Sequence, residues 1–541
     1  MSPTVPDGQL DRRVDVELDH ELARLEWDAV VVGGGHNGLT AGAYLARGGL
    51  QVLVLEARER VGGACQLERP FTDKRFLVSP CAYVVGLLHP LVVKELELER
   101  HGYHVNLIDP HLWCPFEDGT AIALWDDSAR NRAAVAAISP ADVDGYARYE
   151  RLFARIREAL RSPDRDTWLG EAPSRAELEA LLNGDSELIE VLFDEPIAGV
   201  VERHVRDERL RTALHGQGLI GTWAGPRDPG TAAIHAMHSM GLLAGRPGSW
   251  GYVEGGMGRI SVAVARAARE AGAVIATRTR VSAILPEHGV ELEDGTRIRA
   301  RVVVSNADPR TTLNLLHDAA PPELAQRVDA WQMSGPVLKI NCALSRLPRF
   351  TARSSDGVAP HRAMVTIARS IDETQAAYEE SRRGVASPRW AELYFHTAYD
   401  DRIAPPGKHS MIVFAEYAPY ALARGTWDAT RDAVADEAIN EIARFAPDVA
   451  DCIEQRQVLA PPDIEAHVGL SGAHIFQGDC LPQQMWQNRF APRTPAPGVY
   501  LCGACTHPGG SVIAVNGRNA AMAVLADAGQ PITASASISS R

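Results

Sequence analysis

Residues Trp27–Cys65 read WDAVVVGGGHNGLTAGAYLARGGLQVLVLEARERVGGAC and decide the fold. The apolar run Ala29–Val32 is typical of a buried strand, and the stretch Leu39–Arg47 predicts a helix after it. A second apolar run, Val52–Leu55, predicts another strand. A strand, a helix and a strand in this order form the unit from which parallel sheets are built. We therefore expect an α/β protein.

The turn between the first strand and the helix carries Gly33-x-Gly35-x-x-Gly38. Gly33 permits a tight turn, Gly35 lets a pyrophosphate approach the backbone, and Gly38 lets the helix pack closely on the strand. The helix N-terminus offers free N–H groups to phosphates. Glu56, eighteen residues after Gly38, can accept hydrogen bonds from a ribose. These features predict a Rossmann-like dinucleotide-binding domain, and a glycine-rich turn without a ligand is the alternative.

The chain continues from Glu56 as EARERVGG, which ends in Arg60-Val61-Gly62-Gly63. This run resembles the Arg-x-Gly-Gly continuation of flavoproteins in the amine oxidase and phytoene desaturase superfamily. The resemblance implies non-covalently bound FAD, with Glu56 at the ribose and Arg60, Gly62 and Gly63 near the phosphates and the ring. The alternative is a surface turn that happens to hold an arginine.

The composition suits a soluble protein with more than one domain-sized core. The chain has 541 residues, of which 45% are hydrophobic and 23% charged. A net charge of −14 and the lack of a basic patch argue against a nucleic-acid partner. No apolar run approaches the roughly 18 residues that a membrane-spanning helix needs. We expect residues 1–26 to form an arm outside the fold and residues 531–541 to form a disordered tail.

Eight cysteines are scattered along the chain, which indicates a reducing, cytoplasmic location. Cys502 and Cys505 have the spacing of a redox pair, but they lie in an apolar strand and loop rather than at a helix start. Cys65 and Cys81 are too far apart to act as a dithiol beside a flavin. Cys480 precedes the last predicted strand by about twenty residues, and we favour non-covalent FAD over attachment to this thiol.

A second landmark, Gly251-Tyr-Val-Glu-Gly-Gly-Met-Gly258, precedes a predicted helix at Ile260–Glu270. Short strands are expected at 274–276, 281–285 and 300–304, with a hairpin turn at 293–295. In related flavoproteins the strand that holds the position of Val281 contacts the adenine. Residues 256–258 lack a preceding strand and a third glycine, so we expect no second dinucleotide site for NAD(P).

A third landmark lies near the end, where a strand at Val499–Cys502 leads through a loop into a helix from about Val512. In the superfamily that this chain resembles, such a helix start faces the flavin ring, where a positive helix end stabilises reduced flavin. The resemblance therefore implies flavin contacts from Gly503, Gly510, Ser511 and Val512. An ordinary closing strand and helix is the alternative.

The predicted architecture is a Rossmann-like FAD-binding domain of the amine oxidase and phytoene desaturase superfamily with an inserted α+β substrate domain. The FAD-binding domain is expected to combine residues 27–100, 246–325 and 495–530, and the substrate domain residues 101–245 and 326–494. Helical patterning dominates 140–215. Strands are expected at Val337–Leu344 and Met411–Tyr417, with a helix near Trp427–Phe445.

Motifs across the whole chain resemble one branch of the phytoene desaturase-like flavoproteins, the branch of pyridine nucleotide-disulfide oxidoreductase domain-containing protein 2. They are GGGHNGL (33–39), GYVEGGM (251–257), VSNAD (304–308), LKIN (338–341), DIE (463–465), LCGA (501–504) and HPGG (507–510). The resemblance implies FAD and a two-electron oxidation of a small organic substrate. It departs from carotenoid desaturases proper at His36 and Asn37.

Hydride transfer from a substrate C–H bond to FAD is the expected chemistry, with oxygen, a quinone or another acceptor reoxidising the flavin. His507 and Glu254 are candidate bases, although His507 could only order its loop and Glu254 could pair with an arginine. A redox-neutral isomerase and a non-catalytic flavin-fold scaffold are the alternative functions.

The segment Gly216–Tyr252 is rich in apolar and aromatic residues, which suits either a tunnel for a lipophilic substrate or plain core. His235 and His238 have metal-ligand spacing but no evident third ligand, so we expect no metal. Peripheral membrane contact is compatible with a lipophilic substrate, and the sequence leaves the oligomeric state open.

Overall fold

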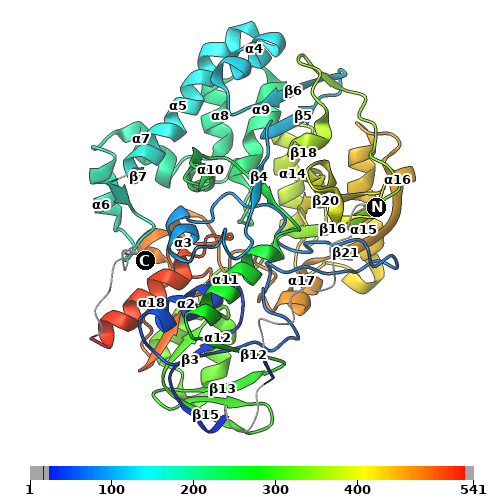
Figure 1. The fold of residues 1–541 in the computed structure, drawn as a ribbon. Coiled ribbons are helices and arrows are strands. Elements are labelled where there is room, and N and C mark those ends of the chain that lie inside the picture. The colour runs from blue at the N-terminus through cyan, green and yellow to red at the C-terminus, as the bar shows by residue number, and fades with distance from the viewer. Residues whose placement is uncertain (1–15, 18–22, 163, 530–541) are drawn as a thin grey trace, which may run out of the picture.

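Two eight-stranded sheets organise the protein, whose computed structural model describes residues 16–17, 23–162 and 164–529 (Figure 1). The first sheet has the order β1-β12-β3-β2-β15-β14-β13, and β22 pairs with β15. Its strands are β1 (Val16–Glu17), β2 (Glu26–Val32), β3 (Val52–Leu55), β12 (Val274–Thr277), β13 (Val281–Leu285), β14 (Gly289–Leu292), β15 (Arg297–Ser305) and β22 (Val499–Leu501). Residues far apart in the chain thus meet in one sheet.

The centre of this sheet is parallel and buried on both faces. Strand β2 pairs in parallel with β3 and β15, and β15 pairs in parallel with β22. Ala29 and Val31 face one hydrophobic cluster, whereas Val30 and Val32 face another. This explains the continuous apolar run in the sequence, because a parallel sheet with helices on both sides has no polar face.

Helices α2 (His36–Arg47), α11 (Gly258–Glu270) and α18 (Val515–Asp527) pack together on one face of the sheet. Helices α12 (Pro309–Leu316) and α13 (Pro322–Asp329) cover the other face. The predicted start of the last helix, about Val512, is wrong by three residues. Ser511 (φ 86°) and Ala514 (φ 67°) have left-handed backbone, so the α-helix can begin only at Val515.

Three further predictions need correction. The turn at 293–295 joins β15 to an additional strand, β14, rather than directly to β13. Strand β11 (Gly251–Val253) does precede residues 256–258, but it pairs antiparallel with β4 (Val105–Leu107), outside the parallel sheet. Within the predicted arm, Val16–Glu17 pair with β12 at the sheet edge, and β2 begins at Glu26. A strand of only two residues at the edge of a sheet is too short to leave a periodic pattern in the sequence. The predicted tail lies outside the described residues.

The second sheet has the order β17-β6-β5-β18-β19-β20-β16-β21. Its strands are β5 (Leu112–Pro115), β6 (Thr120–Leu124), β16 (Val337–Leu344), β17 (Arg353–Ser354), β18 (Val365–Ile367), β19 (Trp390–Tyr394), β20 (His409–Glu416) and β21 (Ile453–Leu459). The predicted strand 337–344 is confirmed without change, and the predicted helix near 427–445 is α15 (Trp427–Ala443). Helix α15 packs on one face of this sheet and leaves the other face free to line a site.

Helices from the middle of the chain form the upper part of Figure 1, coloured cyan to green, as the helical patterning of 140–215 predicts. They are α4 (Ser128–Ile138), α5 (Val143–Leu160), α6 (Arg175–Leu181), α7 (Ser186–Phe193), α8 (Ile197–His204), α9 (Glu208–Leu214) and α10 (Ala232–Ser239). The remaining α-helices and strands are α3 (Pro90–Glu95), β7 (Arg161–Ser162), β8 (Arg165–Asp166), β9 (Leu242–Leu243), β10 (Arg246–Pro247), α14 (Ile371–Arg382), α16 (Val449–Cys452) and α17 (Pro461–Val468).

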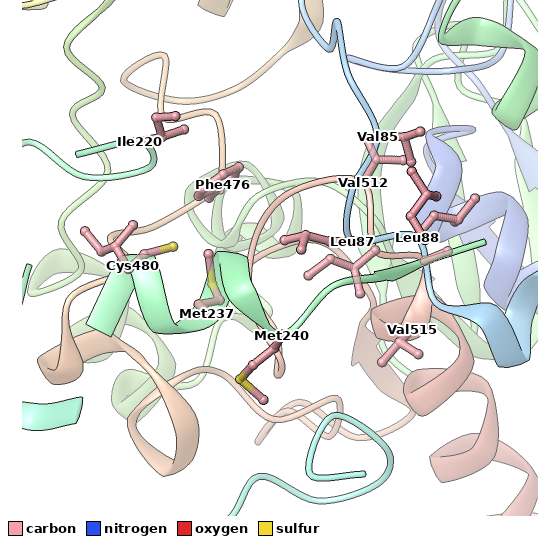
Figure 2. Close-up of a cluster of buried hydrophobic side chains, with 14 of the residues drawn as sticks. Val85, Leu87, Leu88, Ile220, Met237, Met240, Phe476, Cys480, Val512 and Val515 are labelled. Atoms are coloured by element: carbon pink, nitrogen blue, oxygen red, sulfur yellow. The ribbon is translucent and has the colours of Figure 1, made fainter. Parts of the chain in front are cut away.

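One apolar cluster joins these helices to the first sheet. Figure 2 shows Met237 of α10 and Met240 just after it with Phe476 and Cys480, while Val512 lies toward the other end of the same cluster. Segment 216–252 therefore supplies core, as one alternative predicted, and it also reaches the site described below. The exact domain boundaries stay a prediction.

Candidate flavin and substrate site

A central cavity of about 480 Å³ is lined by residues from both sheets. At one end it is lined by the glycine-rich loop, Glu56 and the strand of Val281. At the other end it is lined by side chains of β16, β19 and β20 on the second sheet. A cleft of this size and position suits a small-molecule site between two domains.

The glycine-rich loop has the backbone geometry that phosphate binding needs. Gly33 and Gly35 line the cavity, and Gly33 has a left-handed φ of 100°. Helix α2 begins at His36 with no side chain capping its first turn, so the N–H groups there are free for a ligand. Gly38 lies outside the cavity lining, where a Cβ would stand 2.1 Å from the Gly33 carbonyl oxygen. Gly38 thus acts by letting helix and strand meet.

Glu56 is buried at the edge of the cavity and is fixed by the backbone. Its carboxylate accepts the Gly34 N–H at 2.8 Å and the Arg58 N–H at 2.9 Å. The Arg58 guanidinium in turn donates to the carbonyl of His467 at 2.8 Å. These bonds hold the acid in place, and its remaining acceptor capacity is available to a ribose.

The continuation after Glu56 contributes through Gly63 and Arg58. Gly63 lines the cavity, and the Gly62 N–H donates to the Gly34 carbonyl at 2.8 Å, which joins the two glycine loops. Arg60 does not line the cavity. Its Nε lies 3.4 Å from the Glu59 Oε1 at the surface. Arg58 lines the cavity in its place. The resemblance implies that Arg60 contacts the flavin, whereas the structure places Arg58 on the cavity instead.

Val281 lines the cavity at the same end as Glu56. The Thr279 N–H donates to the Glu56 carbonyl at 2.9 Å, and this bond brings the start of β13 to the acid. Asn306, after β15, also lines the cavity and packs against Gly33 and Gly35. This arrangement would place an adenosine moiety between β13 and the loop after β15.

The loop before α18 supplies Ser511 and Val512 to the lining, whereas Gly503 and Gly510 pack behind it. A Cβ on Gly510 would stand 1.9 Å from the Phe476 Cβ, and one on Gly503 would stand 2.3 Å from the Gln477 Oε1. These two glycines therefore let the 476–477 segment approach, and Phe476 and Gln477 themselves line the cavity.

Arg489 holds this loop from behind. It is 2% exposed, and its guanidinium donates to the carbonyls of Ala504 (2.7 Å), Phe476 (2.7 Å) and Asp479 (2.8 Å). A buried charge of this kind is tolerated because carbonyl oxygens surround it. It ties the two segments that flank one wall of the cavity.

A polar row crosses the second sheet at the far end of the cavity. Lys339 of β16 pairs with Phe414 of β20, and Phe414 pairs with Glu392 of β19. Directly opposed residues point to the same face, so this register brings all three side chains to the cavity. Neither Lys339 nor Glu392 is more than 2% exposed.

The Lys339 ammonium lies 3.7 Å from the Tyr83 ring centroid and has no hydrogen-bond acceptor among the described residues. Burial lowers its pKa well below the ordinary value. Glu392 accepts hydrogen bonds from Gln217 (3.1 Å) and from the Tyr394 hydroxyl. Burial raises the pKa of Glu392 to about 7 despite these bonds. The cavity thus holds a carboxyl group that can take or give a proton near neutral pH.

The two predicted bases lie elsewhere. His507 is buried, and its Nε2 lies 2.6 Å from the Thr167 carbonyl oxygen, outside the cavity lining. Burial lowers its pKa to about 4. Glu254 is partly exposed and pairs with Arg402 at 3.3 Å, also outside the lining. Both placements agree with the alternatives given above, in which His507 orders its loop and Glu254 pairs with an arginine.

All eight cysteines are free thiols, and Cys480 lies in the apolar cluster of Figure 2 rather than on the cavity. Cys81 does line the cavity, but Cys65 does not. Across residues 16–17, 23–162 and 164–529, no group of three or more His, Cys, Asp or Glu is placed to hold a metal ion.

Sequence reasoning missed the polar row. Lys339 lies inside the motif LKIN as the one charged residue of a buried strand, and Glu392 is the one charged residue of the strand WAELY. A charged residue in a buried strand is a signal for a functional site. Which of these residues meet depends on strand register, and the sequence does not show that.

The residues at the first end of the cavity fit FAD. Uncapped N–H groups suit its pyrophosphate, a backbone-fixed carboxylate suits its ribose, and the cavity extends from them to the Ser511–Val512 loop. Comparison with known proteins agrees. Residues 38–525 match the family of flavin containing amine oxidoreductases, and the chain belongs to this family.

Individual relatives and solved structures resemble the chain along nearly its whole length. The chain is 34% identical to pyridine nucleotide-disulfide oxidoreductase domain-containing protein 2 of Mus musculus, over 93% of this chain and 94% of the relative. It is 26% identical to the neurosporene-forming phytoene desaturase of Rhodobacter capsulatus, over 94% and 95% of the two chains. A solved structure of a putrescine oxidase variant superposes with a TM-score of 0.61 at 16% identity, over 93% of this chain and 99% of that chain.

These findings confirm the predicted superfamily, the fold and FAD as the cofactor. The protein is an FAD-dependent oxidoreductase that oxidises an organic substrate. In the part of the chain that the structure describes, no helix is both long and apolar enough to cross a membrane.

Proposed function

We propose that this enzyme desaturates or oxidises a lipophilic organic molecule held at the second-sheet end of the central cavity. The observation that carries the proposal is the continuity of that cavity from the dinucleotide loop to the row Lys339, Phe414 and Glu392. Aromatic and aliphatic side chains dominate the walls around the row, including Tyr83 and Trp250. Such walls favour an apolar substrate body.

Bound FAD would supply the acceptor for a hydride from a substrate C–H bond. In a desaturation, a proton must also leave the neighbouring carbon as the double bond forms. Glu392 is the proposed proton acceptor, because its carboxylate faces the cavity and Gln217 and Tyr394 orient it. The Lys339 amino group, which has no hydrogen-bond acceptor among the described residues, would donate to an electron-rich group of the bound molecules.

The proposed base on β19 and Lys339 on β16, with β20 between them, also restrict how a substrate can lie. The Lys339 Nζ lies 3.7 Å from the Tyr83 ring centroid and 5.9 Å from that of Phe414, so aromatic rings flank it on the cavity wall. The residues then bind and orient one face of the molecule while the apolar walls exclude water. The eight free cysteines support a reducing, cytoplasmic setting for this chemistry.

The test is anaerobic mixing of the FAD-loaded protein with candidate hydrocarbons and amines, followed by the flavin absorbance. Bleaching by a lipophilic compound, with one acceptor molecule consumed per product, supports the oxidation. Product formation without consumption of any acceptor would point to an isomerase instead. A Glu392→Gln variant should retain FAD and bleach much more slowly.

A further inference from the structure

A second cavity, of about 560 Å³, lies beside the central one and is called the side cavity below. Apolar side chains form part of its wall, among them Tyr149, Phe153 and Leu214. Exposed residues on its lining, such as Ser128 and Pro247, mark its opening to solvent. The side cavity therefore joins the surface to the interior, and its volume is that of a small-molecule site.

The two cavities share one wall. Five residues line both of them, namely Gln217, His238, Trp250, Met364 and Glu392. The strand register shows the same continuity, because Glu392 of β19 pairs with Thr366 of β18, and Thr366 lines the side cavity. A molecule in either cavity therefore meets the same shared side chains.

The central cavity reaches solvent at its dinucleotide end. Among the described residues, the exposed ones on its lining are Arg280, Ala466 and Gly469. Arg280 follows Thr279, whose N–H bonds the Glu56 carbonyl, and the segment 466–469 supplies the carbonyl that accepts the Arg58 guanidinium. Because FAD would fill that end, the side cavity is the route left for a substrate to reach the polar row on the second sheet.

His238 on the shared wall carries polar atoms that the protein leaves without partners. It is 3% exposed, and neither of its ring nitrogens has a hydrogen-bond partner among the described residues. Its ring packs edge-on against Trp250 with centroids 5.7 Å apart. Burial lowers its pKa to about 4, against the opposite effect of the nearby Gln217 backbone, so the imidazole is neutral at physiological pH. A buried polar group without a partner is costly, which indicates that a ligand or water meets His238 where the cavities join.

The charged groups around the side cavity balance one another. Its lining carries three arginines and three carboxyl groups, namely Arg151, Arg157, Arg246, Asp126, Glu150 and Glu392. Arg246 pairs with Asp126 at 3.4 Å, and Glu150 interacts electrostatically with Arg157. A lining without net charge favours a neutral ligand. A neutral imidazole offers one donor and one acceptor nitrogen, which suits the oxygen of a hydroxyl or carbonyl group.

We propose that His238 binds a hydroxyl or carbonyl oxygen of a lipophilic substrate where the two cavities join. The oxidisable C–H bond then lies in the central cavity, and the apolar remainder of the molecule lies in the side cavity. This inference rests on the proposed function, because it takes the bound molecule to be the one that the flavin oxidises. It names the substrate class as a neutral lipophilic alcohol or ketone.

The test compares ligands that differ in the oxygen group. Octan-1-ol, octan-2-one and 1-chlorooctane are titrated anaerobically into the FAD-loaded protein, and binding is measured by calorimetry. His238→Phe keeps an aromatic ring beside Trp250 but removes both nitrogens. We expect this variant to bind the alcohol and the ketone about fivefold more weakly and to bind 1-chlorooctane within about twofold of the wild type. If His238→Phe does not fold, His238→Leu makes the same comparison.

Two further variants separate hydrogen bonding from packing. His238→Gln keeps a donor and an acceptor, so its affinity for octan-1-ol should lie closer to that of the wild type than to that of His238→Phe. His204→Phe is the matched control, since His204 also lies in the last turn of a helix, has its Nδ1 2.8 Å from the Val200 carbonyl oxygen and is absent from both linings. It should leave all three affinities unchanged.

A wild-type protein that does not bind octan-1-ol would overturn the proposal. Equal losses for octan-1-ol and 1-chlorooctane in His238→Phe would show that the ring only packs, and no loss would show that water rather than a ligand meets His238. Either result overturns the proposal. Photoreduction of bound FAD, measured on every variant, reports the flavin site separately. Octan-1-ol binding that depends on His238, in a protein whose reducible flavin no lipophilic compound bleaches, would contradict the proposed function and not the binding site.

Discussion

Replacing Gly38 by alanine tests the idea that close contact between α2 and β2 shapes the phosphate site. The added Cβ would stand 2.1 Å from the Gly33 carbonyl oxygen and 3.0 Å from the Asn306 Cβ. A backbone oxygen cannot rotate away as a side chain can. The helix must therefore move from the strand by about 0.9 Å before the contact reaches 3.0 Å.

The expected loss follows from that movement. Inserting a methyl group into a packed contact destabilises the fold by about 1–3 kcal/mol. The higher helix propensity of alanine stabilises the helix by about 1 kcal/mol. The net effect on the apoprotein is thus at most about 2 kcal/mol. The affinity for FAD is affected more directly, because the free N–H groups of the first turn of α2 move relative to Gly33 and Gly35. Losing one or two charge-assisted hydrogen bonds raises the Kd for FAD by about 10- to 100-fold.

The assay is titration of apoprotein with FAD, followed by flavin fluorescence, together with thermal unfolding. Ala46→Gly is the control, because it weakens the last turn of the same helix by about 1 kcal/mol without adding an atom near the phosphates. Its Kd for FAD should stay within about threefold of the wild type. A Gly38→Ala protein that binds FAD as tightly as the wild type would refute the reasoning.

The other predictions concern the ribose acid, the proton acceptor and the buried arginine. Glu56→Gln leaves one of two backbone N–H groups without an acceptor, so FAD affinity should fall about tenfold or more in the same titration. Flavin reduction should rise with pH through about 7, because Glu392 must lose its proton to act as a base, and Glu392→Gln should abolish this dependence in stopped-flow traces. Arg489→Met should lower the free energy of unfolding by about 3 kcal/mol or more in denaturant titrations, since three carbonyls lose their donor. Arg493→Met removes a half-exposed pair with Asp527 and should cost less than about 1 kcal/mol.

The parts of the site that depend on local sequence could be predicted. Gly33 and Gly35 lie on the cavity as expected, because a turn between a strand and a helix fixes its own geometry within a few residues. Ser511 and Val512 also reach the cavity, although the helix start that suggested them lies at Val515. The error arose because left-handed backbone in a non-glycine residue leaves no reliable mark in a sequence.

The parts that depend on long-range pairing could not be predicted. Lys339 and Glu392 are 53 positions apart in the chain, and they meet only because Phe414 pairs with both of their strands. A one-residue slip of β20 would turn Phe414 away from the cavity. His507 and Glu254 were selected for their nearness in sequence to predicted flavin contacts, which does not determine whether a side chain faces the cavity.

The row on the second sheet also explains how one flavin fold can serve different substrates. The dinucleotide end is held by backbone hydrogen bonds and by glycines, such as Gly38 and Gly510, that leave no room for a side chain. The row Lys339, Phe414, Glu392 and Thr366 lies on a sheet face whose opposite side is packed by α15. Side chains on such a face can change in charge and size while strand pairing and the packed side stay the same. Substrate choice can therefore vary across this row without disturbing the flavin site.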